Sequence, residues 1–410
     1  MEAKQPPQYH CPGASEPITR AVHLSRLASS YPLCRHCPER HETGLLGDAQ
    51  RVWLNALNLC TTGERFFSRD GFEALLHNEI DAKKMRRVGF SLGMWSRIAQ
   101  MGLVHLEVEA EERPTATHLE VAIGCDGSQA TQEFAAYASE GVRFGGLSTL
   151  ELGIVPFPAF AHTLKNEKTV AGLYLFASPG EKRVQIRGLC FGEEGQPLAE
   201  EEALAELERV FAASEKRFRP DRKNGEQHFC NAVPNYLATL QEVLPHAEET
   251  QRILLDPRGG CVLRELLEAN NFVIINEELD EERVTEQLAS QNAAVGLLLL
   301  RGDQQLRVAL PQVGFLAPAE IAQRLVEVVL EEPEARCVAA VALHGELVTK
   351  LPALAKRIYV AGGSTRSLDQ QMCERKAVLG LDSSGMFRRS LDGITFPDAL
   401  WSALLFLRHH

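Results

Sequence analysis

The sequence of 410 residues has no long hydrophobic run and no excess of positive charge, and each absence excludes a class of protein. No stretch reaches the roughly 18 to 20 apolar residues that a membrane-spanning helix needs. Residues 1–9 are polar and rich in proline, so they hold no signal-peptide core. The net charge is −12, which argues against a broad nucleic-acid or anionic-membrane surface, because Lys and Arg make most phosphate contacts. We therefore expect a cytoplasmic protein that binds no membrane.

Several common motifs are missing as well. No Walker sequence, H-E-x-x-H zinc motif or G-x-S-x-G nucleophile elbow occurs. The 10 cysteines do not resemble a disulfide framework, which is typical of short secreted domains. Half of them lie in or beside apolar runs, where a buried thiol is the expected state: Cys60, Cys125, Cys190, Cys261 and Cys337.

The N-terminal end of the chain carries a cluster of cysteine and histidine. Cys34 and Cys37 form a C-x2-C knuckle, and two thiolates at this spacing can chelate one tetrahedral Zn2+. Cys11 with His41, or with His10 in its place, would complete four ligands. No second thiol follows Cys11, so only one knuckle is complete. The segment is therefore either a zinc module or a reduced arm in which these residues are incidental.

From about residue 65 onward, short apolar runs alternate with amphipathic stretches. The pattern predicts strands at residues 118–123, 147–154 and 170–176 and helices at residues 82–101, 130–141 and 200–211. Residues 217–227 are polar with Pro and Gly, which makes them the best linker candidate. The same alternation then returns twice, up to a closing helix at 396–407. Strands separated by helices are typical of largely parallel sheets, so we expect three related α/β domains in a row.

Three stretches carry a family resemblance. The first is GCDGS at 124–128 with LGIVPFPA at 152–159, the second is FASPG at 176–180, and the third is VLGLDSSG at 378–385. In this order and spacing they resemble the α-D-phosphohexomutases, the family of phosphoglucomutases and phosphomannomutases. The resemblance covers about residues 60–410.

The resemblance implies an enzyme in which a phosphorylated serine passes its phosphoryl group to a hexose phosphate. Such chemistry needs a nucleophile, a divalent cation, an acid or base near the serine, and a phosphate clamp. The nucleophile position is Ser178, but the family's His-Asn-Pro after it is PGE at 179–181 here. The family's basic positions in the first domain are Cys125 and Ser128. These changes remove positive charge from the place where a serine phosphate would sit.

The family's metal loop, Asp-Gly-Asp-x-Asp-Arg, presents three carboxylates to one Mg2+, a hard cation that takes oxygen ligands. By resemblance the three aspartate positions are Leu300, Gly302 and Gln304. Asp303 is one place out of register beside Arg301, so we expect it in a surface ion pair. Without the metal, the transferring phosphoryl group loses its main stabiliser. We therefore expect neither bound Mg2+ nor phosphoryl transfer.

The sugar loop is better preserved. Ser384 and Gly385 match the family's Gly-Gly-Glu-x-Ser-Gly, and Asp382 stands in place of its glutamate. A carboxylate and a hydroxyl on a Gly-rich turn can bind the hydroxyl groups of a hexose phosphate, although a plain polar turn is the alternative. The helix at 396–407 matches the end of the family's third domain, so we expect the fourth domain and its phosphate clamp to be absent. The open cleft would then expose apolar surface that favours a protein partner.

These features predict three consecutive α/β/α domains with mixed, largely parallel sheets, preceded by a small Cys/His segment. The expected limits are 1–58 for that segment and 59–216, 228–331 and 332–410 for domains I, II and III. The leading hypothesis is a catalytically inactive relative that binds a hexose phosphate or a protein partner. One alternative is an active phosphohexomutase that uses Ser178, with metal ligands recruited from elsewhere. Another is a zinc-organised N-terminal module that binds protein.

Overall fold

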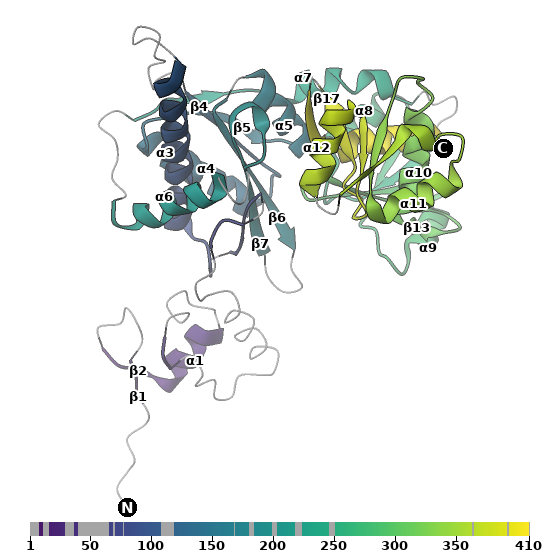
Figure 1. Ribbon diagram of the computed structural model, residues 1–410. Helices are drawn as coiled ribbons and strands as arrows, with labels where there is room; N and C mark the ends of the chain where they lie inside the picture. The colour runs from purple at the N-terminus through teal and green to yellow at the C-terminus, as the bar shows by residue number, and fades with distance from the viewer. Residues whose placement is uncertain are drawn as a thin grey trace, which may run out of the picture.

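A computed structural model of the chain describes residues 8–10, 16–28, 37–39, 65–68, 70–76, 78–107, 119–167, 169–179, 184–198, 203–217, 224–245, 251–362, 365–391 and 393–409. Three mixed sheets with covering helices follow one another along the chain (Figure 1). The predicted fold class is confirmed. The predicted domain limits stay a prediction, although the first sheet extends as far as Phe229.

A small N-terminal unit comes first. It consists of β1 (Gln8–Tyr9), β2 (Ile18–Thr19) and α1 (Arg20–Ala28), and the two strands pair antiparallel. The ring of Tyr9 stacks on the ring of His23 with 4.1 Å between centroids. Leu27 and Cys37 are also buried, so these side chains form a core among the residues of the unit that the structure describes.

The first sheet has six strands in the order β3-β7-β6-β4-β5-β8. Their bounds are β3 (Gly71–Leu75), β4 (Glu120–Cys125), β5 (Ser148–Ile154), β6 (Ala171–Pro179), β7 (Val184–Phe191) and β8 (Gln227–Phe229). Strands β4, β5, β6 and β8 are parallel, while β3 and β7 pair antiparallel. The strands predicted at 118–123, 147–154 and 170–176 are thus confirmed as β4, β5 and β6.

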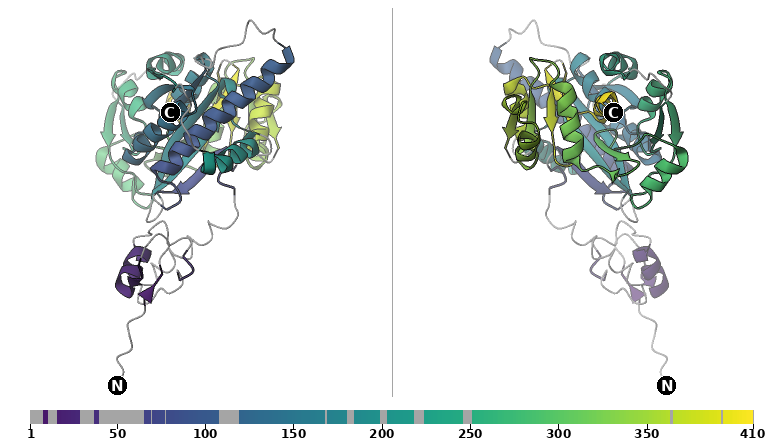
Figure 2. Two further views of the ribbon diagram at one scale, coloured as in Figure 1. Left: turned by 90° about the vertical axis from the view of Figure 1, so that its left-hand side faces the viewer. Right: turned by 90° about the vertical axis from the view of Figure 1, so that its right-hand side faces the viewer.

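Helices cover both faces of this sheet because its strands are apolar on both sides. On β6, Leu173 and Leu175 face one core, while Tyr174 and Phe176 face the other. The first face is covered by α3 (Ala82–Glu107), α4 (Gln129–Phe144) and α6 (Ala203–Arg217), and the second by α5 (Phe157–Asn166). Figure 2 shows α3 lying along the outside of the domain. A 3-10 turn, η3 (Glu193–Gly195), follows β7.

Helices α3 and α4 approach each other closely at two glycines. A Cβ atom on Gly89 would lie 2.0 Å from the carbonyl oxygen of Ala138, and one on Gly141 would lie 2.0 Å from the carbonyl oxygen of Arg86. Real atoms cannot come that close, so backbone packs directly against backbone at this crossing.

The second and third sheets repeat one topology. The second has the order β10-β9-β11-β12-β13 and the third β15-β14-β16-β17-β18, each with three parallel strands followed by an antiparallel pair. The strands of the second sheet are β9 (Arg252–Leu255), β10 (Val273–Asn276), β11 (Val295–Leu300), β12 (Gln305–Leu310) and β13 (Gly314–Phe315). Those of the third are β14 (Cys337–Ala340), β15 (Ile358–Ala361), β16 (Leu379–Leu381), β17 (Arg388–Leu391) and β18 (Ile394–Pro397).

Helices connect these strands. The segment that leads from the first sheet to the second contains α7 (Val233–Ala238) and η4 (Gln241–Val243). The second domain has α8 (Cys261–Glu268), α9 (Val284–Gln291) and α10 (Pro318–Val329), and the third has α11 (Val341–Lys350), η5 (Ala355–Arg357), α12 (Thr365–Arg375) and α13 (Ala399–His409). No helix in the described ranges is long and apolar enough to cross a membrane.

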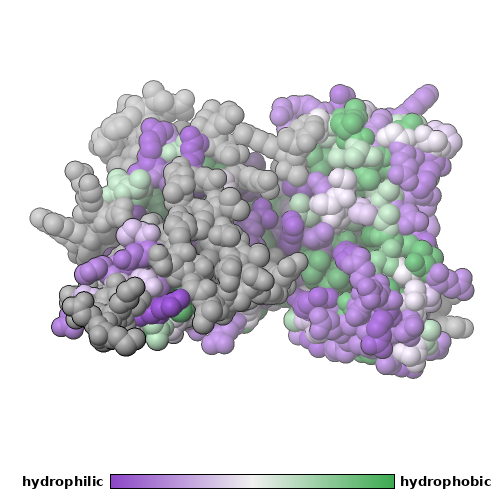
Figure 3. Space-filling model, turned by 90° about the horizontal axis from the view of Figure 1, so that it is seen from below, coloured by the Kyte–Doolittle hydropathy of each residue, from purple (hydrophilic) through white to green (hydrophobic). Residues whose placement is uncertain are grey.

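The last helix is covered along its apolar length, and the exposed apolar surface expected in an open cleft stays a prediction. Every residue of α13 from Ala399 to Leu407 is buried, because the helix packs between α10 and the start of β12. Its apolar residues join one core cluster that runs through all three domains. On the face seen in Figure 3, apolar residues gather in the middle of the half formed by the second and third sheets, with hydrophilic residues around them. The large exposed apolar side chains are scattered over separate elements, among them Ile154, Phe229, Val313, Val341 and Val360.

Candidate functional site

The loop between β11 and β12, residues 301–304, stands at the predicted metal-loop position and has an unusual backbone. Arg301, Gly302 and Asp303 have φ angles of 57°, 66° and 66°, so three consecutive residues are left-handed. L-residues with side chains rarely adopt this conformation. It persists only where the surrounding structure fixes it.

Contacts with other domains fix the loop. The amide of Phe157 in α5 donates to the carbonyl of Gly302 at 2.9 Å, and the amide of Ala399 in α13 donates to the carbonyl of Asp303 at 3.1 Å. A Cβ atom on Gly302 would lie 2.5 Å from the hydroxyl oxygen of Tyr174, so only glycine fits. The loop therefore joins domains I, II and III.

Asp303 is buried, and its predicted surface ion pair with Arg301 is wrong. Its residue exposure is 7%, and its Oδ1 accepts a hydrogen bond of 2.9 Å from the amide of Gly260. Because the left-handed turn redirects the chain, the carboxyl group faces the protein while Arg301 stays exposed. Burial raises the pKa of Asp303 to about 6, the Gly260 amide opposes this, and the charges of Asp398 and Asp126 raise it further.

The three residues at the predicted aspartate positions of the metal loop make other contacts in this structure. Leu300 ends β11 and is half-buried, the carbonyl of Gly302 is bonded to Phe157, and Gln304 donates its amide to the carbonyl of Arg301 at 2.6 Å. No group of three or more His, Cys, Asp or Glu in the described part of the chain is placed to hold a metal ion. The loop thus does not fit Mg2+, which takes several oxygen ligands. That the protein binds no Mg2+ stays a prediction.

The predicted sugar loop lies directly beside this loop. Oδ1 of Asp382 accepts hydrogen bonds from the amide and the hydroxyl of Ser384, at 2.6 Å and 2.5 Å. Gly385 has a φ of 83°, and its carbonyl accepts the amide of Leu306 at 3.0 Å. The side chain of Gln305 donates to the carbonyl of Ser384 at 2.6 Å. The structure therefore brings the two predicted loops together through the first residues of β12.

Ser178, the predicted nucleophile position, lies in β6, where its backbone pairs with Gln185 of β7. Asp126 follows β4 and reaches the same place. Its Oδ2 accepts the amide of Ala177 at 2.8 Å, and its Oδ1 accepts the amide of Ser128 at 3.1 Å and the hydroxyl of Thr131 at 2.7 Å. The carboxylate of Asp126 is thus hydrogen-bonded to Ala177, the residue directly before the nucleophile position.

The two positions at which the family carries basic residues are structural in this chain. Cys125 is 2% exposed, and burial raises the pKa of its thiol. Ser128 caps α4 by accepting the amide of Thr131 at 3.3 Å. Neither residue can supply positive charge to a phosphate on Ser178.

Sequence reasoning missed a polar link between the α7 segment and domain III. The hydroxyl of Tyr236 donates to Oδ1 of Asp398 at 2.7 Å, and Arg389 donates to the carbonyl of Thr239 at 2.9 Å. Burial raises the pKa of Asp398, although Arg389 and the hydrogen bonds of Trp401 and Tyr236 oppose this. The two partners of the first bond are 162 positions apart, so no local pattern could have revealed it.

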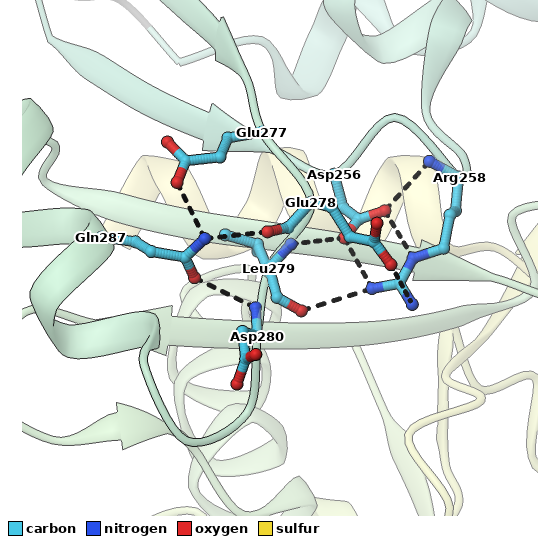
Figure 4. A network of polar contacts seen from close by, with 7 residues as sticks. All are labelled: Asp256, Arg258, Glu277, Glu278, Leu279, Asp280 and Gln287. Atoms are coloured by element: carbon cyan, nitrogen blue, oxygen red, sulfur yellow. Dashed lines mark hydrogen bonds and ion pairs between the residues drawn. The ribbon is translucent and has the colours of Figure 1, made fainter.

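Domain II fixes its own side of the loop through Asp256, which follows β9 (Figure 4). Its carboxylate accepts Nε and Nη2 of Arg258, each at 2.7 Å, and the amide of Leu279 at 2.8 Å. The side-chain amide of Gln287 holds the adjacent segment by donating a hydrogen bond of 2.8 Å to the carboxylate of Glu277. This network sets the turn that ends at Gly260, the donor to Asp303.

Two residues of the N-terminal cluster, His10 and Cys37, lie among the described residues. His10 is exposed, and its backbone amide donates to Oε2 of Glu39 at 3.0 Å. Cys37 is buried and is not in a disulfide. Cys11, Cys34 and His41 lie outside the described residues. The zinc hypothesis therefore remains untested.

The fold belongs to the class of multidomain α/β proteins, and in this chain the β11–β12 loop contacts residues of all three domains. Within that class, residues 96–218 match the family model described as "Phosphoglucomutase/phosphomannomutase, alpha/beta/alpha domain I". The phosphoglucosamine mutase of Streptomyces coelicolor is 24% identical over 205 residues, which are 49% of this chain and 42% of that protein. The phosphoglucosamine mutase of Pediococcus pentosaceus is 26% identical over 155 residues, 37% of this chain and 33% of that protein.

The matched region thus spans less than half of these curated relatives. Solved structures extend the likeness in fold. A phosphoglucomutase/phosphomannomutase family protein from Burkholderia thailandensis has a TM-score of 0.66 at 15% identity, covering 84% of this chain and 76% of its own. The phosphoglucomutase parafusin from Paramecium has a TM-score of 0.62 at 11% identity, covering 85% and 70%. The resemblance to the phosphohexomutases is thus confirmed, in sequence over residues 96–218 and in fold over most of the chain.

Proposed function

We propose that this chain is a non-catalytic relative of the phosphohexomutases that acts by binding, with a hexose phosphate as its first candidate ligand. The observation that carries the proposal is the β11–β12 loop. Its one carboxyl group, Asp303, is buried and bonded to Gly260. A loop of this shape works as a joint between domains, and it offers no set of oxygen ligands that could place Mg2+ beside a phosphoryl group.

The surroundings of Ser178 support the same proposal. A serine phosphate carries roughly two negative charges at neutral pH. Asp126 is fixed against the amide of Ala177, so like charges would be close to each other. Repulsion between these charges would disfavour the phosphorylated state.

The sugar loop supports the binding role. Ser383 and Ser384 are exposed and Asp382 is half-exposed, so hydroxyl and carboxyl groups remain available around a turn that domain II holds in place. Hydroxyl groups of a sugar are bound by such donors and acceptors. A protein partner that uses the same face is the other outcome of a binding experiment.

A coupled mutase assay tests the absence of activity. Glucose 1-phosphate, mannose 1-phosphate and glucosamine 1-phosphate are each supplied with Mg2+ and a bisphosphate primer. We expect no turnover above that of Ser178→Ala. Turnover that is present in the wild type and lost in Ser178→Ala would establish the alternative, an active phosphohexomutase that finds its metal ligands elsewhere.

We also propose that the N-terminal segment holds one Zn2+ through Cys11, Cys34, Cys37 and His41. The small core around Tyr9, His23 and Leu27 supports this, because units of this size need a metal or another cross-link to stay folded. Elemental analysis of the full chain should give one zinc per chain and none for Cys34→Ser combined with Cys37→Ser. A wild-type chain without zinc would leave a reduced arm as the explanation.

A further inference from the structure

Three carboxyl groups, one from each domain, surround the β11–β12 loop. Asp126 follows β4, Asp303 lies in the loop itself, and Asp398 precedes α13. The charges of Asp126 and Asp398 both act on Asp303. Asp398 is fully buried, and within the described residues its Oδ2 has no hydrogen-bond partner.

Little positive charge offsets these carboxylates. Arg389 has its Nη1 at 3.8 Å from Oδ2 of Asp398, and Arg301 beside Asp303 is exposed. The Asp303 carboxyl group accepts a hydrogen bond from a neutral donor, the backbone amide of Gly260. The other titratable groups near this junction include Tyr174, Tyr236 and Cys125, which are neutral at physiological pH, and His162, whose ring centroid lies 6.3 Å from that of Tyr236.

The same loop holds the domains together. The amides of Phe157 and Ala399 donate hydrogen bonds to the carbonyls of Gly302 and Asp303, respectively. The amide of Gly260 donates to the Asp303 carboxyl group. A charge placed on Asp303 is therefore placed at the point where all three domains meet. When the junction opens, water reaches the carboxylate and removes the cost of its burial.

We infer that this junction is a pH-sensitive joint, tightest when Asp303 is protonated and opened more readily when Asp303 is ionised. The inference does not depend on the proposed function, because a joint of this kind can occur in an active or an inactive chain.

The sign and size of the effect follow from linkage. A carboxyl group whose pKa is about 6 in the closed state and 3.8 in water binds its proton more tightly in the closed state. Opening is thus rarest below pH 3.8 and becomes more frequent as pH rises through 6. Between pH 5 and pH 7.5 the opening equilibrium constant should increase about tenfold.

Hydrogen exchange of the full chain, followed by mass spectrometry, tests the joint. After correction for the intrinsic effect of pH, peptides that contain Phe157, Gly260 or Ala399 should lose about tenfold in protection between pH 5 and pH 7.5. Asp303→Asn removes the titration and should show no such slope. Asp280→Asn, a change at an exposed aspartate of the same domain, should keep the wild-type slope.

Two results would overturn the inference. One is an unchanged slope in Asp303→Asn, which would assign the titration to another group, such as the histidine His162 near Tyr236. The other is a wild-type chain whose junction peptides change no more with pH than peptides from α9, away from the joint. The second comparison needs no variant, so it decides the matter even if Asp303→Asn does not fold.

Discussion

The pKa values of two buried aspartates of domain II are shifted in opposite directions because their hydrogen-bond partners differ. Burial raises the pKa of both Asp256 and Asp303. At Asp256 the hydrogen bonds from Arg258 and from the amides of Leu279 and Arg258 outweigh burial, so its pKa is lowered. At Asp303 one neutral amide cannot do so. A cation within hydrogen-bond distance thus decides the sign.

Asp256→Asn should destabilise the protein by about 2 kcal/mol at pH 7, because the Arg258 guanidinium and two backbone amides lose a charged acceptor. Arg258 is 40% exposed, so it can turn to water, and this limits the loss. The depressed pKa contributes stability above pH 3.8 that is lost as pH falls below it. Denaturant unfolding at pH 7 and pH 3 measures both effects, and the difference between wild type and variant should shrink at pH 3.

Asp280→Asn is the matched control. Asp280 is exposed and accepts one local hydrogen bond, from the amide of Glu282 at 2.9 Å. An asparagine can accept the same bond, so a change below about 0.5 kcal/mol is expected. Equal losses in the two variants would contradict the role given to Asp256.

At the residue scale, sequence motifs point to the positions of candidate residues but do not tell whether a side chain is buried or hydrogen-bonded. Ser178, Asp382 and Ser384 were predicted because their motifs are local and resemble those of a known family, and their roles stay predictions. The burial of Asp303 could not be found, because it depends on three successive left-handed residues and on contacts from α5 and α13. Asp398 and Tyr236 carry no local signal at all.

Among the elements, the crossing of α3 and α4 depends most on single residues. Gly89 and Gly93 lie one helical turn apart on α3, but their surroundings differ. A Cβ atom on Gly89 would lie 2.0 Å from the carbonyl oxygen of Ala138, whereas one on Gly93 would have its nearest neighbour, the carbonyl oxygen of Val142, at 3.5 Å. Only Gly89 is required by close packing.

Gly89→Ala should therefore destabilise the protein by about 3 kcal/mol, because the two helices must move apart. Gly93→Ala should be neutral or stabilise it by up to about 1 kcal/mol, because alanine favours a helix over glycine. Chemical denaturation of both variants measures the difference. Similar stabilities would show that the helices do not pack backbone to backbone.

Periodicity predicted the longer elements, and turn chemistry explains what it missed. The helices expected at 82–101, 130–141 and 200–211 are present as α3, α4 and α6 with shifted ends. Helix α5 was not predicted, although Pro156 and Pro158 lie at its start. They are the cap and the second residue of the helix, positions where proline is tolerated because no helical hydrogen bond is needed from its nitrogen.

At the scale of the whole molecule, the chain has the fold of the phosphohexomutases, and its β11–β12 loop joins the three domains. The loops of all three domains still meet, through Phe157, Gly260, Ala399 and Leu306. Their contacts are now made between protein groups. The packing of α13 against domain II could not be predicted from its uniformly apolar sequence.

The most direct test of this account is the phosphorylation state of Ser178. Intact-mass and peptide mass spectrometry would be applied to the purified chain before and after incubation with glucose 1,6-bisphosphate or mannose 1,6-bisphosphate and Mg2+, with Ser178→Ala as control. The account predicts no phosphate on Ser178 under either condition. A phosphate that appears on Ser178 and is passed on to an added hexose phosphate would contradict it.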